Sequence, residues 1–112
     1  MDESPPFPEF IRAFPQPDSP LPGLQAWMLQ TPQGIAMFYA VPDGVEVPEH
    51  AHGAQWGVVL AGTVEFTIGG ETRTYGRGDT YAVEDGQLHR AVLSPGFVGI
   101  DVFADADRYT PR

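Results

Sequence analysis

The sequence contains no cysteine and no lysine, and it has no long run of apolar residues. Without cysteine, neither a disulfide nor a thiolate metal site can form, and nothing in the chain requires an oxidising compartment. No apolar run approaches the roughly 20 residues that a membrane helix needs, and the first residues lack the basic and apolar regions of a secretory signal. We therefore expect no membrane partner and a cytoplasmic location.

Positive charge is also scarce, because six arginines stand against fifteen acidic residues, which gives a formal net charge of −9. A surface with this charge repels phosphate backbones, and the chain has no basic stripe to offset the repulsion. We therefore expect no nucleic-acid partner. The acidity itself is what an ordinary small protein uses to stay in solution.

The twelve prolines are unevenly placed, since seven of them fall within residues 1–23. Proline lacks an amide donor and blocks helix interiors, so these residues are expected to form an extended Pro-rich N-terminal arm. The arm contains four large apolar side chains: Phe7, Phe10, Ile11 and Phe14. We expect them to pack on the body or on a partner subunit, with disorder limited to the first four to six residues. Residues 24–112 have the length of a single domain.

After residue 23, short apolar runs rich in β-branched and aromatic residues alternate with Gly, Pro and Asp turns. The expected strands are 24–30, 35–41, 56–60, 64–68, 71–75, 80–83, 88–93 and 97–104. Such a series, without any stripe of helical period, predicts an all-β antiparallel sandwich or barrel. Gly69-Gly70 is a strong signal for a two-residue hairpin turn. In 56–60 both faces are apolar, which predicts cover on both sides and favours a homodimer.

The chain has three histidines, and their positions indicate a shared site. His50 and His52 are one residue apart, and on an extended strand residues i and i+2 lie on the same face. His89 follows a second turn-rich segment. Neutral imidazole is the commonest metal ligand in proteins, and it suits transition metals such as Zn, Fe, Ni and Cu. The alternative is that the three rings are buried and satisfied by hydrogen bonds alone.

The stretch around the first two histidines resembles the first motif of the cupin superfamily, which consists of small jelly-roll barrels. That motif is G-x5-H-x-H, then three or four residues, then E-x6-G. Gly44, His50, His52 and the closing Gly62 match it. Gln55 stands at the glutamate position, with two intervening residues after His52.

The stretch around the third histidine is similar to the second cupin motif, G-x5-P-x-G-x2-H-x3-N. Gly78, Gly86 and His89 keep its spacing in full. Glu84 replaces the proline and Leu93 replaces the asparagine. The two motifs together cover residues 44–93, with the Gly-Gly hairpin between them.

The resemblance implies an antiparallel jelly-roll barrel over residues 24–112 that binds one divalent transition metal (Fe, Ni, Mn, Zn or Cu). It implies His50, His52 and His89 as ligands, and Gln55 as either a fourth ligand or an amide that lines the pocket. Because glutamine is neutral, this ligand set would leave the full charge of the metal in place and favour an anionic small-molecule ligand.

The implied function is that of a metal-binding cupin acting on a small organic molecule, as a dioxygenase or an isomerase. The alternatives are a non-catalytic module that senses or binds a small molecule, with or without metal, and a metal-free interaction domain. No catalytic residue can be assigned, because Glu49 and Glu84 qualify as a base only if a loop turns them inward, and Arg90 is expected in solvent. Seven residues are expected to line the pocket or fill the core: Met28, Met37, Phe38, Tyr39, Trp56, Tyr81 and Phe97.

Overall fold

The computed structural model describes residues 6–19 and 21–111, which contain nine β-strands and one short helix. The elements in chain order are α1 (Glu9–Arg12), β1 (Gln25–Thr31), β2 (Gly34–Val41), β3 (Val45–His50), β4 (Gln55–Ala61), β5 (Val64–Ile68), β6 (Glu71–Tyr75), β7 (Thr80–Val83), β8 (His89–Leu93) and β9 (Phe97–Phe103). The eight expected strands are all present, each within a few residues of its expected bounds.

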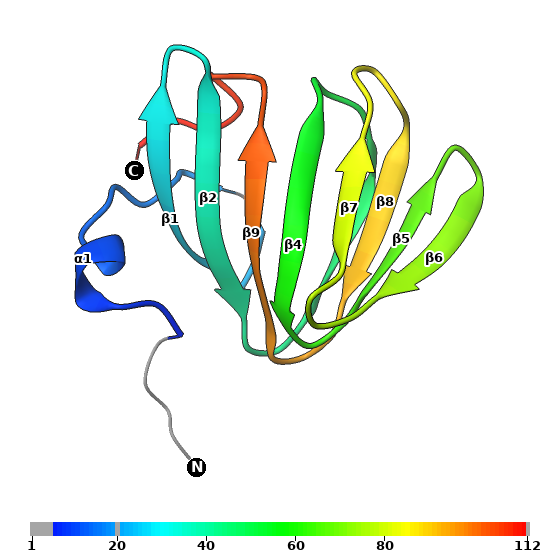
Figure 1. The fold of residues 1–112 in the computed structure, drawn as a ribbon, viewed down its shortest axis with the longest axis horizontal. Helices are drawn as coiled ribbons and strands as arrows, with labels where there is room; N and C mark the ends of the chain where they lie inside the picture. Colours follow the sequence, from blue (N-terminus) through cyan, green and yellow to red (C-terminus); the bar gives the residue numbers. More distant parts are fainter. Residues whose placement is uncertain (1–5, 20, 112) are drawn as a thin grey trace.

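The strands form two antiparallel sheets that close into a jelly-roll barrel, as expected from the sequence (Figure 1). One sheet has the strand order β1-β2-β9-β4-β7 and the other has the order β3-β8-β5-β6. Strands far apart in the sequence are therefore neighbours: β9 lies between β2 and β4, and β8 lies between β3 and β5. This order brings the segments that carry His50 and His89 side by side.

The helix α1 was not expected from the sequence, and β3 was not among the expected strands, although His50 and His52 were expected on an extended segment. Pro48 and two glutamates interrupt the apolar pattern of β3, and a shift in its pairing with β8 follows Val47. The helix is a single turn that begins after Pro8, whose carbonyl accepts hydrogen bonds from the amides of Ile11 and Arg12. Proline is tolerated at a helix start because the first amides of a helix have no partner within it. The Pro-rich arm is therefore not wholly extended.

Apolar side chains from both sheets fill the interior, and the largest that are almost fully buried include Phe97, Met28 and Ile35. The arm packs outside the barrel, where the ring of Phe7 contacts those of Trp27 and Phe38 at centroid distances of 6.2 and 5.7 Å. Phe10 remains exposed. The disorder expected for the first residues falls largely on residues 1–5, which lie outside the described part.

The outer face of the five-stranded sheet carries an apolar row that crosses all five strands. The strand register places in it Leu29, Ala36, Val102, Trp56 and Ala82. No member of the row is charged, and Leu29, Trp56 and Val102 are 49%, 46% and 42% exposed. Within the described residues, no helix has the length and hydropathy needed to cross a membrane.

Candidate functional site

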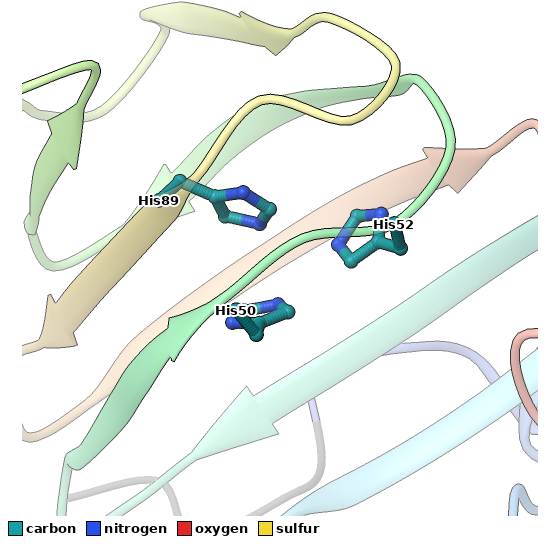
Figure 2. A group of neighbouring side chains, drawn as sticks. All are labelled: His50, His52 and His89. Atoms are coloured by element: carbon teal, nitrogen blue, oxygen red, sulfur yellow. The ribbon is translucent and has the colours of Figure 1, made fainter.

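The three histidines come from two adjacent strand ends and one loop. His50 is the last residue of β3 and pairs directly with His89, the first residue of β8. His52 lies beyond β3, in the loop of residues 51–54. The expectation that His50 and His52 share a face through strand alternation was therefore wrong for His52, because the strand ends before it. The loop still directs its ring toward the other two, as Figure 2 shows.

The three rings lie close enough to share one ion. Their centroids are 4.2 Å apart for His50 and His89, 4.7 Å for His52 and His89, and 5.0 Å for His50 and His52. One ring nitrogen from each histidine lies within 4.8 Å of the others. The nitrogens are close enough for small side-chain adjustments to bring all three to one transition-metal ion with bonds of about 2.0–2.1 Å.

Hydrogen bonds determine which nitrogen of each ring carries the proton. Nδ1 of His50 lies 2.8 Å from the carbonyl oxygen of Pro48, Nδ1 of His52 lies 2.7 Å from that of Gly53, and Nδ1 of His89 lies 2.9 Å from that of Gln87. A carbonyl oxygen only accepts, so each Nδ1 donates and each Nε2 is left with a free lone pair.

The Nε2 atoms of His52 and His89 are buried and have no hydrogen-bond partner among the described residues. An unpaired buried polar atom costs about 1–3 kcal/mol, so two of them side by side need an explanation. Only one nitrogen of each of these rings is satisfied by protein, which argues against histidines held by hydrogen bonds alone. The donor set therefore fits a metal ion.

Burial lowers the pKa of His52 and of His89, and the neighbouring positive charge of Arg108 lowers both further. The hydrogen bonds to Gly53 and Gln87 oppose this effect only in part. Both rings are therefore neutral at pH 7. Neutral imidazole is the form that binds metal.

Gln55 is the first residue of β4 and lines the same cavity as the histidines. Its side-chain Nε2 donates a 2.9 Å hydrogen bond to Oδ2 of the buried Asp101. The amide nitrogen is thereby committed, and the carbonyl oxygen Oε1 is the atom left for another partner. Both roles expected for Gln55, as a ligand and as a pocket-lining amide, are compatible with this arrangement.

Asp101 on β9 was not found by the sequence reasoning. Its carboxylate accepts hydrogen bonds from the Tyr39 hydroxyl at 3.1 Å, from the Tyr81 hydroxyl and from Gln55. Burial raises the pKa of Asp101 to about 6, and the three hydrogen bonds moderate that rise. Gly57 leaves room for the cluster, because a Cβ at this position would collide with Asp101 and Tyr81. A carboxylate therefore lies one hydrogen bond behind Gln55, although the glutamate of the motif is missing.

The histidines line a partly open cavity of about 60 Å³ with largely apolar walls. Among the described residues, the cavity is lined by one carboxylate, Asp101, and one guanidinium, Arg108. Of the expected pocket residues, Met37 and Tyr39 line it, whereas Trp56 lies on the outer face. Arg90 is exposed, as expected. Glu49 and Glu84, which could act as a base only if a loop turned them inward, are exposed as well.

The fold and the two motifs define a small jelly-roll protein with a three-histidine cluster. The chain belongs to the Cupin domain family, whose sequence model matches residues 37–95, just over half of the chain and all three histidines. The resemblance to the cupin superfamily is therefore confirmed. No curated protein sequence matches the chain.

Several solved structures share this fold. An RmlC-like cupin from Shewanella frigidimarina is 26% identical with a TM-score of 0.72, and the alignment covers 84% of this chain and 86% of that one. KdgF from Halomonas sp. is 26% identical with a TM-score of 0.68, covering 89% of this chain and 94% of that one. A salicylate 1,2-dioxygenase from Pseudaminobacter salicylatoxidans matches at 19% identity and a TM-score of 0.68, over 82% of this chain and 29% of that longer chain, and shows the fold alone.

Proposed function

We propose that this cupin binds one divalent transition metal through His50, His52 and His89 and acts on a small organic molecule held in the adjoining cavity. The observation that carries the proposal is the pair of buried, unpartnered Nε2 atoms on His52 and His89. His50 completes a set of three donors, and the bond from Gln55 Nε2 to Asp101 leaves Oε1 of Gln55 available as a fourth ligand. Nitrogen-rich sets of this kind suit Fe, Ni, Cu, Zn and Mn.

When bound, the metal would supply a Lewis acid that polarises an oxygen of the substrate. The protein supplies apolar walls that exclude water, together with one carboxylate in the cavity wall, Asp101. An isomerase needs a base beside the Lewis acid, whereas a dioxygenase does not. Asp101 is the candidate base for an isomerase, but its carboxylate already accepts three hydrogen bonds, so the site favours neither alternative.

The metal content of protein purified without a His-tag or a nickel column tests this proposal. We expect close to one equivalent of metal by elemental analysis, and we expect it to be lost in His50→Ala and His89→Ala. Glu49→Gln is the matched control, because Glu49 is exposed next to His50 and should retain the metal. Substoichiometric metal in the parent protein, with unchanged thermal stability in the histidine variants, would contradict the proposal.

A panel of small hydroxy and oxo compounds separates the catalytic role from the sensing role. Turnover that depends on His50 and Asp101 would support an enzyme. Saturable binding without turnover would support the non-catalytic alternative, in which the same cavity senses or carries its ligand.

We also propose that the chain forms a homodimer through the apolar row on its outer face. The arm covers Trp27 and Phe38 at one side of the sheet, and Trp56 and Val102 at the centre remain exposed. In a protein of net charge −9, a charge-free row over five strands offers a surface on which two copies can meet with little charge repulsion. The cytoplasmic location stays a prediction.

A further inference from the structure

Arg108 lines the histidine cavity and forms no ion pair with any residue that the structure describes. Its Nε is buried and makes no hydrogen bond to any described residue. Its guanidinium carbon lies 5.8 Å from the ring centroid of Phe103 and 5.0 Å from that of Tyr109, so two aromatic rings hold the side chain. The exposed Arg73 differs, because it pairs with Glu71 at 2.9 Å.

The lack of a carboxylate partner is unexpected in a chain with an excess of nine negative charges. Two acidic residues in this part of the structure are engaged elsewhere. Asp105 accepts a 2.8 Å hydrogen bond from the backbone amide of Gly53, and Asp101 accepts bonds from two tyrosines and Gln55. A guanidinium carries five donors in a planar fork, and those of Arg108 are left for a ligand.

The segment that carries Arg108 is fixed to the barrel on both sides. The side-chain amide of Gln30 donates to the carbonyl oxygens of Ala106 and Tyr109 at 2.7 and 3.0 Å. The amide of Asp18 in the arm donates to the carbonyl of Thr110 at 2.7 Å. These bonds hold the backbone around Arg108 in place, and a preorganised segment loses less entropy on binding.

We propose that Arg108 binds the carboxylate of a small organic acid whose other end reaches the three histidines. The inference rests on the proposed function in that both place the ligand in the same cavity. Of the arginines that the structure describes, Arg108 alone lines this cavity, and its remaining walls are largely apolar. One guanidinium fork matches one planar, singly charged carboxylate.

A phosphate ester fits this cavity less well. A dianion needs several donors, such as a glycine-rich loop or a helix start, and the lining of the cavity offers one guanidinium only. Asp101 in the same wall would also repel the second negative charge once it ionises. The ligand class is therefore a monocarboxylate with an oxygen at its far end.

The test compares the binding of 4-hydroxybutanoate, which has an oxygen at the end opposite its carboxylate, with that of 4-hydroxybutanamide, which has nearly the same shape without the charge. Affinities would be measured by calorimetry on zinc-loaded protein and on protein stripped with EDTA. A charge-assisted, two-pronged hydrogen bond contributes about 1.5–3 kcal/mol, so we expect the acid to bind roughly 10- to 100-fold more tightly than the amide.

Three variants isolate the role of Arg108. Arg108→Met keeps a flexible apolar stem against Phe103 and Tyr109 and should bring the acid-to-amide ratio close to one. Arg108→Lys keeps the charge without the fork and should give an intermediate ratio. Arg77→Met removes the same charge from an exposed turn and should keep the parent ratio. Thermal melting of each variant shows that it is folded.

Three results would overturn the inference: an unchanged ratio in Arg108→Met, no binding of 4-hydroxybutanoate to the parent at millimolar concentration, or equally tight binding of inorganic phosphate. Failure of the metal proposal would be seen separately. A protein that contains no metal but still prefers the acid in an Arg108-dependent way would support this inference and contradict the metal centre.

Discussion

Gln55 donates its side-chain amide to the carboxylate of Asp101 across 2.9 Å, inside the barrel wall. The cupin motif has a glutamate at position 55, where this chain has a neutral glutamine. The negative charge is found instead on Asp101, which is hydrogen-bonded to Gln55. The neutral amide at position 55 is what allows a buried carboxylate at position 101, because two carboxylates at this distance repel each other unless one is protonated.

Restoring the motif with Gln55→Glu should therefore destabilise this protein. The substitution removes the donor and places two buried acids in contact, so we expect a loss of about 2 kcal/mol or more in urea unfolding at pH 8. The double variant Gln55→Glu/Asp101→Asn reverses donor and acceptor and should recover most of the loss. If the double variant were as unstable as the sum of the two single variants, the proposed pairing would be wrong.

The stability of the protein should depend on the ionisation of Asp101. Burial raises its pKa from 3.8 to about 6, so this carboxyl contributes stability in full below pH 3.8 and loses it as the pH rises through about 6. The loss is on the order of 3 kcal/mol at most. Asp101→Asn cannot ionise, so its stability relative to the parent should rise between about pH 4 and 7, measured by unfolding of EDTA-treated protein.

The ionisation of His52 and His89 changes the stability in the opposite sense to that of Asp101 over the same pH range. Their pKa values are lowered, so their contribution is present above the unfolded-state value of 6.5 and is lost as the pH falls. They occur in the parent and in Asp101→Asn alike, so the difference between the two curves isolates Asp101. Tyr81→Phe removes a hydrogen bond that lowers the pKa of Asp101 and should move the transition to higher pH. A flat difference curve would contradict the assignment.

The sheet framework and the histidine cluster could be predicted from the sequence for different reasons. Turn residues such as Gly69-Gly70 act locally, and both adopt positive φ in a hairpin that joins Ile68 to Glu71, as predicted. The histidines follow motif spacing, which holds even though His52 lies in a loop. By contrast, β3 was not delimited, because its proline and glutamates obscure the alternation of apolar and polar residues. This strand is held by its pairing with β8, which is distant in the sequence.

The polar residues of the cavity depend on long-range packing and were harder to find. Asp101 gave a readable signal, because it occupies an inward position in β9 together with Phe97, Gly99 and Phe103. An acid on the buried face of an apolar strand indicates a partner or a role. Arg108 gave no such signal, since its place at the cavity depends on bonds from Gln30 and the arm, far away in the sequence.

Metal binding should raise the melting temperature of protein stripped with EDTA. The ion gives the unpaired Nε2 atoms of His52 and His89 a partner in the folded state only, so stabilisation follows the metal concentration. At about 100 times the dissociation constant the gain is about 2.7 kcal/mol, or roughly 10 °C for a domain of this size. Scanning calorimetry with Zn²⁺ and Ni²⁺ measures the shift.

The same titration on His50→Ala separates the site from surface binding. This variant lacks one of the three donors and should show a much smaller shift, whereas Glu49→Gln should shift like the parent. Equal shifts in all three proteins would mean that the ions bind to surface acids.

The apolar row on the outer face should hold two copies together. Trp56→Glu places a negative charge in the row, between Val102 and Ala82, and should convert a dimer into a monomer without loss of fold, because residue 56 is 46% exposed. Light scattering after size-exclusion chromatography measures the mass. Thr74→Glu adds the same charge on the exposed strand β6 of the other sheet and should remain dimeric. A parent protein that is monomeric at high concentration, or a dimer that survives Trp56→Glu, would show that this face serves another purpose.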